Sequence, residues 1–187
     1  ENINYWIFAG TLLGQTCNKG LLPNDDDADI ALSSIEWERL QPILLTMVTS
    51  IAPHVQMIVR KGKDSDIIAA KVVDTRSGTY MDIVLFKETP KGLVHTKAYV
   101  IHGSSAIQLS RDDIFPLQNC IFESFILKCP IKPMQTLKQL YRRPFYNCLN
   151  YQETPPAPHT PLPKIAVAIP TYNRAGYVQL CAAALSK

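Results

Sequence analysis

Asp25, Asp26, Asp27 and Asp29 place four carboxylates within five positions of the chain. Carboxylates at this density repel one another and lose solvation on burial, so they are tolerated mainly where a cation lies among them. Because successive side chains of a strand alternate between its two faces, Asp25, Asp27 and Asp29 would share one face. The other face would carry residues typical of a core: Ala28, Ile30 and Leu32. The run therefore predicts a strand that holds a metal ion, with a solvated acidic loop as the alternative.

Asp82 is the second acidic feature, because it is the only charged residue in the run from Tyr80 to Phe86. That run is apolar on both faces, which is typical of a central buried strand. A lone carboxylate there is costly unless it meets a cation or a hydrogen-bond donor. Together with Asp27 and Asp29, it could hold two Mg²⁺ ions that clamp the attacking and leaving oxygens of a phosphoryl group. The alternative is a buried Asp82 that is satisfied by backbone groups or by an arginine.

Gly10 and Thr11 are the third feature that could do chemistry. They follow the β-prone residues 5–9 and open the sequence Gly-Thr-Leu-Leu-Gly, whose two glycines suggest a strand-to-helix turn close to a ligand. Such a turn would offer backbone N–H groups, and the Thr11 hydroxyl, to a phosphate. Lys19 could also reach a phosphate, although a loop lysine is more often simply solvated.

The elements that must position these residues follow from the apolar periodicity. Ser33 and Glu36 match a capping box, and apolar residues then recur at helical spacing. The β-like runs 67–74 and 79–86 are joined by a short polar segment that contains glycine, which predicts a hairpin. A further helix is expected over residues 133–143. The expected fold is α/β (α+β), with helices packed on a small mixed sheet.

Composition limits the class of protein. The 187 residues are 47% hydrophobic and 19% charged, which is typical of a globular chain with one good core. The net charge of +3 and the scattered basic residues argue against a nucleic-acid partner. No apolar run approaches the roughly 18 residues of a membrane span. The chain opens on Glu1 without a methionine, as a fragment would. Its five cysteines have no CxxC spacing and are expected to be mostly reduced.

Three motifs lie close together near the start of the chain: Gly10-Thr11-Leu12-Leu13-Gly14, Lys19-Gly20 and Pro23-x-Asp25-Asp26-Asp27-x-Asp29-Ile30. They closely resemble the LicD family, whose relatives include fukutin and the fukutin-related protein. Asp82 lies where the third carboxylate of this nucleotidyltransferase-fold superfamily is expected. The resemblance covers roughly residues 3–145. The chain departs from it at Cys17-Asn18 and at Asn24, where many members have Arg-His and Trp.

The resemblance implies a nucleotidyltransferase-like domain over residues 1–150. Its activity would be transfer of a phosphorylated group, such as phosphocholine or an alditol phosphate, from a CDP-linked donor to a glycan hydroxyl. The cofactor would be Mg²⁺ or Mn²⁺, held by the catalytic residues Asp27 and Asp29, with Asp25 as an outer ligand. Asp82, also catalytic, would complete the metal site or take the acceptor proton as general base. Phosphate would be bound by Gly10, Thr11 and Lys19. The compartment would be the cytoplasm for a bacterial or viral member and the Golgi lumen for a eukaryotic one.

A second resemblance lies nearer the end of the chain. Residues 151–163 contain five prolines, which predict a stiff, extended linker. Residues 167–174 then resemble the opening strand and turn of a family 2 (GT-A) glycosyltransferase. In that Rossmann-like fold, Thr171 and Tyr172 would begin the nucleotide-sugar pocket. Residues 164–187 would be the incomplete start of this second domain.

Three other functions stay open at the level of sequence. An EF-hand calcium loop would use four acidic residues at its positions 1, 3, 5 and 12: Asp25, Asp27, Asp29 and Glu36. Position 6 of that loop needs glycine, however, and the chain has Ile30 there. A nucleotidyltransferase with an NTP donor would need the same metal site as the phosphotransferase. A degenerate, non-catalytic domain is the third alternative.

Overall fold

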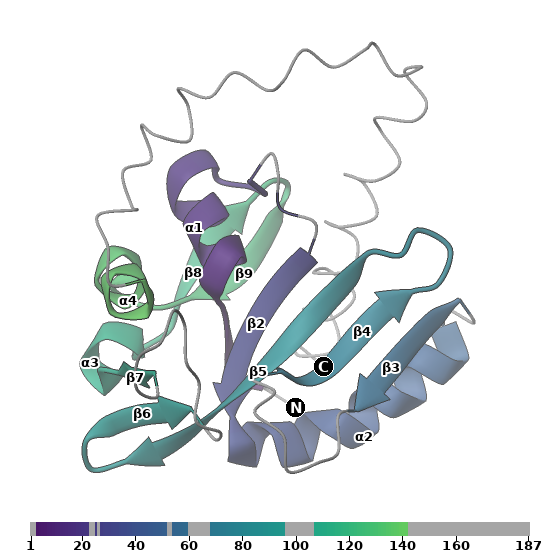
Figure 1. The fold of residues 1–187 in the computed structure, drawn as a ribbon, viewed down its shortest axis with the longest axis horizontal. Coiled ribbons are helices and arrows are strands. Elements are labelled where there is room, and N and C mark those ends of the chain that lie inside the picture. Colours follow the sequence, from purple (N-terminus) through teal and green to yellow (C-terminus); the bar gives the residue numbers. More distant parts are fainter. Residues whose placement is uncertain are drawn as a thin grey trace.

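The structure is a computed structural model that describes residues 3–22, 25, 27–51, 54–59, 68–95 and 107–141. Within these residues, one mixed sheet is built from seven strands: β1 (Tyr5–Ile7), β2 (Asp27–Ser33), β3 (Val55–Val59), β4 (Ile68–Asp74), β5 (Tyr80–Thr89), β6 (Gly92–His95) and β7 (Gln108–Leu109). The strand order is β1-β2-β5-β4-β3, and β6 pairs with β5 and β7 (Figure 1). β2 and β5 are parallel, whereas every other pair in the sheet is antiparallel. The predicted α/β fold is confirmed.

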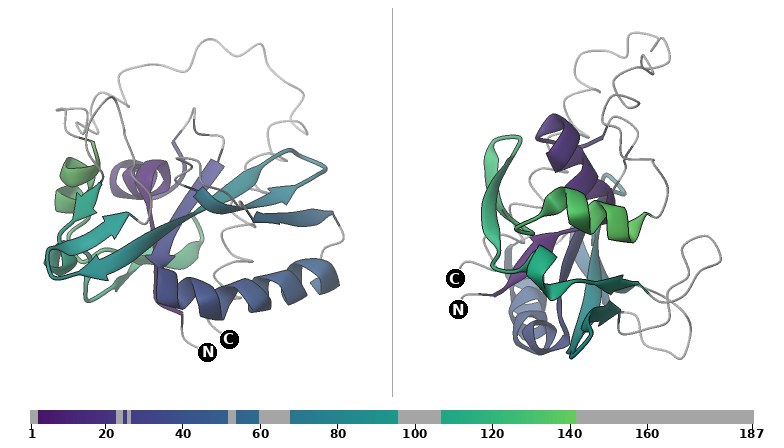
Figure 2. Two further views of the ribbon diagram at one scale, coloured as in Figure 1. Left: turned by 60° about the horizontal axis from the view of Figure 1, so that its bottom comes forward. Right: turned by 90° about the vertical axis from the view of Figure 1, so that its left-hand side faces the viewer.

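Helix α2 (Ser34–Ile51) lies along one face of the sheet (Figures 1 and 2). It begins as the capping-box pattern predicts, because Glu36 N donates a hydrogen bond to Ser33 Oγ at 3.2 Å. Its buried side chains belong to the core that contains the apolar residues of β2, β4 and β5 on this face: Ala28, Ile30, Leu32, Val72, Met81 and Ile83. The predicted alternation of β2 is therefore confirmed, with Ala28, Ile30 and Leu32 in the core.

The opposite face carries a second apolar cluster, near the ends of β2 and β5. Trp6 and Phe8 pack against Phe86 with ring centroids 5.8 and 5.4 Å apart, and Ala31 and Val84 lie in the same cluster. The short helix α3 (Arg111–Ile114) and helix α4 (Pro133–Leu140) contribute buried residues to it. Side chains alternate along a strand, so the earlier residues of β2 and β5 on this face are the acidic ones. The cluster thus lies next to the acidic residues, further along the same face of β2 and β5.

Helix α1 (Ala9–Asn18) and the hairpin of β8 (Gln118–Phe122) and β9 (Phe125–Cys129) pack together beside the sheet (Figure 1). Gln15 Nε2 joins them by donating a hydrogen bond to Ile121 O at 3.1 Å. Cys120 and Cys129 form a disulfide across the hairpin. The expectation of reduced cysteines is therefore wrong for this pair. Strand pairing brings their Cα atoms to 5.9 Å, a proximity that spacing along the chain did not reveal.

The other predicted hairpin and helix are present among the described residues. The hairpin is present as β4 and β5, and β5 is buried on both faces as predicted. The helix expected over 133–143 is present as α4. No helix among the described residues is long and apolar enough to cross a membrane. The proposed linker and the glycosyltransferase-like start, residues 151–187, lie outside the described residues, so the division into domains stays a prediction.

Candidate metal centre

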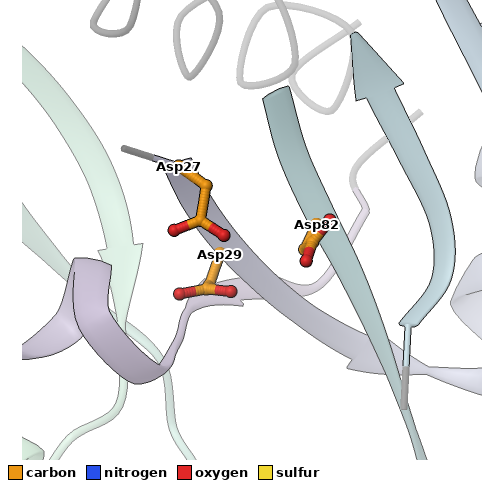
Figure 3. A group of neighbouring side chains, drawn as sticks. All are labelled: Asp27, Asp29 and Asp82. Carbon is orange, nitrogen blue, oxygen red and sulfur yellow. The ribbon is translucent and has the colours of Figure 1, made fainter. Parts of the chain in front are cut away.

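Three carboxylates from β2 and β5 gather on one face of the sheet (Figure 3). Asp27 and Asp29 are alternate residues of β2, and Asp29 is paired with Asp82 in the parallel register of the two strands. One oxygen of each carboxylate lies within 4.8 Å of the others. Asp82 is buried, whereas Asp27 and Asp29 are half-buried. The structure thus brings together the three acids that the sequence singled out.

The start of α1 fixes Asp29 through three hydrogen bonds. Phe8 N donates to Asp29 O at 3.0 Å, and Asp29 N donates to Thr11 Oγ1 at 2.7 Å. The backbone N–H of Gly10 donates to the Asp29 carboxylate. The chain enters this arrangement through Ala9, whose φ of 41° lies in the left-handed region that residues other than glycine rarely adopt. Asp29 is consequently held at its amide, its carbonyl and its carboxylate.

The electrostatics of the site favour a cation. Burial raises the pKa of Asp29 well above its usual range, and the charges of Asp27, Asp25 and Asp82 raise it further. The Gly10 N–H acts in the opposite direction. A divalent cation would offset both the burial and the repulsion, and carboxylate oxygens are the ligands that Mg²⁺ prefers. The residues therefore fit an ion such as Mg²⁺ or Mn²⁺ in their charge and in their chemistry.

Lys71 enters the site from β4, where sequence reasoning had missed it. It lies opposite Asp82 in the antiparallel register of β4 and β5. Its Nζ is 2.8 Å from Asp82 Oδ1 and 3.1 Å from Oδ2, and it lies 3.7 Å from the centroid of the Tyr80 ring. The sequence contained a sign of this role, because Lys71 is the only charged residue in the apolar run 68–73. The register of the predicted hairpin pairs it with Asp82.

Two positions of α1 require glycine because other atoms of the chain approach them closely. A Cβ on Gly10 would lie 2.5 Å from Asp25 Oδ2. A Cβ on Gly14 would collide with the backbone carbonyl of Gly20, where the chain leaves the helix. Gly10 therefore makes room for an acid next to the metal centre, whereas Gly14 serves the packing of the chain.

The other residues that the sequence predicted for the site lie outside the group of three carboxylates. Asp25 lies outside the group of three carboxylates, with Oδ2 against Gly10. Thr11 is fully buried, and its hydroxyl already accepts the hydrogen bond from Asp29. Lys19 follows the last residue of α1, about 14 Å along the helix axis from Gly10 at 1.5 Å per residue. Phosphate binding by the Thr11 hydroxyl and by Lys19 stays a prediction. Two further predicted residues lie outside the described part of the chain: Thr171 and Tyr172.

The EF-hand alternative is contradicted by the structure. Asp27 and Asp29 lie within strand β2 instead of in a calcium-binding loop. Glu36 lies in the first turn of α2, where it accepts hydrogen bonds from Asn4 Nδ2 at 2.9 Å and from Arg39 Nη1 at 2.8 Å. The acid that would complete the loop is thus committed to the start of a helix.

Comparisons with known proteins give relatives of greater length. An uncharacterized protein of Rickettsia typhi (strain ATCC VR-144 / Wilmington), RT0683, is 46% identical over 141 residues, which cover 75% of this chain and 40% of that protein. Another, RP689 of Rickettsia prowazekii (strain Madrid E), is 49% identical over 44 residues, or 24% of this chain and 16% of that protein. The chain therefore spans less than half the length of these curated relatives.

A solved structure and a protein family also match. The lincomycin-bound lincosamide antibiotic adenylyltransferase LnuA has a TM-score of 0.45 and 11% identity, with 80% of this chain and 86% of that chain covered. The family described as LicD/FKTN/FKRP, nucleotidyltransferase domain, matches residues 2–132. That range contains all three carboxylates and Lys71, and it is more than half of the chain. The chain therefore belongs to the LicD/FKTN/FKRP nucleotidyltransferase-domain family.

Proposed function

We propose that this chain is the catalytic domain of a metal-dependent phosphotransferase, which moves a phosphorylated group from a CDP-linked donor to a glycan hydroxyl. Membership of the family supports a transferase. The observation that carries the proposal is the group formed by Asp27, Asp29 and Asp82. A divalent ion bound there would neutralise phosphate charge and orient the attacking and leaving oxygens.

The chain's own residues would prepare the site before the ion and the donor arrive. Asp27, Asp29 and Asp82 would hold Mg²⁺ or Mn²⁺. Phe8 and Thr11 act through Asp29, because their hydrogen bonds fix its backbone, and we assign them as positioning residues. A site whose ligands are fixed in advance pays less reorganisation when charge develops in the transition state.

The donor phosphate would approach across the start of α1. The hydrogen bond from the Gly10 N–H to the Asp29 carboxylate supports this approach, because it joins the start of the helix to the acids. A helix N-terminus favours anions because its N–H groups and its dipole both point toward them. Gly10 has no side chain to block the approach, and Asp25 beside it would serve as an outer ligand of the metal.

A second candidate is transfer of a nucleotidyl group from an NTP, which the family's description as a nucleotidyltransferase domain supports. The two reactions differ in the phosphorus that is attacked. In the phosphotransferase, the acceptor oxygen bonds to the phosphorus that carries choline or an alditol, and CMP leaves. In the nucleotidyltransferase, the acceptor oxygen bonds to the α-phosphorus, and pyrophosphate leaves.

A screen of donors tests the proposal on the full-length protein. CDP-choline, CDP-ribitol, CDP-glycerol, CTP and ATP would each be supplied with Mg²⁺ or Mn²⁺ and glycan acceptors, with CMP and pyrophosphate measured as products. Release of CMP that requires both metal and acceptor is the expected result. Asp27→Asn should abolish it, whereas Asp112→Asn, a change at an exposed acid of α3, should not. Release of pyrophosphate would favour the second candidate, and release of neither product would contradict both.

The proposal also includes a second domain, formed by the residues that follow the proline-rich linker. Thr171 and Tyr172, in the segment that resembles a family 2 glycosyltransferase, would bind a nucleotide-sugar in a second domain that begins at residue 164. A phosphotransferase joined to a glycosyltransferase would modify and extend the same glycan. Limited proteolysis of the full-length protein tests the division, because a proline-rich linker over 151–163 should be cut first.

A further inference from the structure

We propose that Lys71, in addition to the bound metal, is a ligand of the donor phosphate. In the resting site Asp82 holds the ammonium of Lys71, and this ammonium turns to the phosphate once a metal is bound. This inference rests on the proposed function, since it requires a metal and a phosphate at Asp82. It concerns a residue on β4, a strand that contributes none of the three carboxylates.

The resting position of Lys71 is defined by its contacts. Its Nζ lies 2.8 Å from one oxygen of Asp82 and 3.1 Å from the other. The ring of Tyr80 also contacts Nζ, with its centroid at 3.7 Å. The Lys71 side chain is 18% exposed and the Asp82 side chain 6%, so the pair is shielded from solvent. The ammonium thus lies against a predicted metal ligand, at the edge of the group of three carboxylates.

Metal binding and this ion pair compete for the same oxygens. An ammonium group has three donors and no acceptor, and in the resting site it straddles both oxygens of Asp82. An oxygen that ligates a divalent ion has its electron density directed at that ion, and two cations at such short range repel each other. Lys71 would therefore lose part of its contact with Asp82 as the metal site fills. Its donors would need another anion.

The donor phosphate is the anion within reach. A divalent ion held by Asp27, Asp29 and Asp82 would also bind oxygens of the donor phosphate, next to its carboxylate ligands. A phosphate oxygen bound beside Asp82 would consequently lie close to the position that Nζ already occupies. Lys71 would need only a small rotation of its flexible chain to donate to it, as a point charge on the phosphate. The Tyr80 ring, which contacts Nζ in the resting site, would keep the ammonium near this position.

Two titrations on the full chain test this role without measuring turnover. The first titrates Mn²⁺ alone, and the second titrates inorganic pyrophosphate into the Mn²⁺-saturated protein. Pyrophosphate serves because CDP-linked and NTP donors share its chemistry. Lys71→Met should bind Mn²⁺ at least as tightly as the parent, since a repelling charge is gone. It should bind pyrophosphate about tenfold more weakly or worse, because a charge-assisted hydrogen bond is lost.

Two further variants complete the design. Lys71→Arg keeps the charge and should retain most of the pyrophosphate affinity. Lys87→Met makes the same substitution at an exposed position of β5 and should match the parent in both titrations. If Lys71→Met fails to fold, as judged by its thermal unfolding, Lys71→Gln replaces it and is judged by the same two measurements.

The possible outcomes separate this inference from the proposed function. A parent protein that does not bind Mn²⁺ would overturn both. A parent that binds both probes, with Lys71→Met matching it in pyrophosphate affinity, would overturn the role of Lys71 alone. Weaker binding of Mn²⁺ by Lys71→Met, with pyrophosphate affinity unchanged, would likewise overturn it and reduce Lys71 to a group that only orients Asp82.

Discussion

Asp29 and Asp82 lie opposite each other in the parallel register of β2 and β5, and their charges meet different surroundings. The ammonium of Lys71 lies 2.8 Å from Asp82. The charges that act on Asp29 are those of Asp27, Asp25 and Asp82, and they raise its pKa. Two facing carboxylates that share one metal site should therefore affect the stability of the metal-free protein in opposite directions.

Asp29→Asn should raise the free energy of unfolding of the metal-free protein at pH 7, because it removes a repelled and partly desolvated charge. Asp82→Asn should lower it by about 1–3 kcal/mol, because it leaves the shielded Lys71 ammonium without its carboxylate. Urea unfolding in EDTA measures both changes. Added Mn²⁺ should stabilise the parent but neither variant. Stabilisation by both substitutions in EDTA would show that Lys71 does not compensate Asp82.

The raised pKa of Asp29 predicts a specific dependence of stability on pH. A carboxyl group whose pKa is higher in the folded state than in the unfolded state binds its proton more tightly when folded. The parent protein should therefore lose stability as pH rises from the ordinary aspartate pKa through the raised one. Asp29→Asn cannot titrate at this position, so its stability advantage over the parent should be near zero at low pH and should grow across this window. Urea unfolding of both proteins in EDTA at a series of pH values gives the difference. An advantage that does not change with pH would contradict the assignment.

Gly10 and Gly14 should respond differently to the same substitution. Gly10→Ala would meet the end of the Asp25 side chain, which can move, and alanine favours the helix by about 1 kcal/mol over glycine. Its stability should stay within about 1 kcal/mol of the parent, while pyrophosphate binding to the Mn²⁺-loaded protein weakens. Gly14→Ala would strike the backbone of Gly20, which cannot move without shifting the chain, and should cost about 1–3 kcal/mol. Thermal unfolding and the pyrophosphate titration separate the two effects. Equal loss of stability in both variants would mean that Gly10 is a packing glycine as well.

Local patterns in the sequence were sufficient to predict much of this fold. The alternation in β2 predicted which of its residues face the core, because a strand has a period of two. Ser33 and Glu36 predicted the start of α2, and the run around Asp82 predicted a strand buried on both faces. Each of these features depends on residues close together in the chain. Residue types and the family resemblance predicted that Asp82 joins Asp27 and Asp29, but neither predicted that β2 and β5 pair in parallel.

The features that sequence reasoning missed depend on register between distant segments. Lys71 reaches the site only because a hairpin pairs it with Asp82. Cys120 and Cys129 meet because β8 and β9 pair across a turn. The hydroxyl of Thr11 accepts a hydrogen bond from Asp29, and the glycines next to Thr11 did not reveal this contact between segments separated along the chain. Residue type identified possible chemistry, and the pairing of strands decided where it occurs.

The hydrogen bond from Asp29 to Thr11 gives the last prediction. Thr11 is fully buried, and its hydroxyl is the acceptor for the Asp29 N–H at 2.7 Å. Thr11→Val keeps the shape of the side chain but removes the acceptor, which should cost about 1–3 kcal/mol of stability because a buried donor is left unpaired. Thr11→Ser keeps the acceptor and removes one methyl group, at a cost of about 1 kcal/mol.

Stability alone would not distinguish a positioning role from a packing role, so the binding of Mn²⁺ decides between them. If Thr11 positions Asp29, then Thr11→Val should weaken Mn²⁺ binding in a direct titration, because a metal ligand loses the anchor of its own backbone. Thr11→Ser should bind Mn²⁺ as the parent does, even though it is less stable. Should both variants bind Mn²⁺ with the parent's affinity, the hydroxyl would serve only the folding of α1 against β2, and the metal centre would be positioned without it.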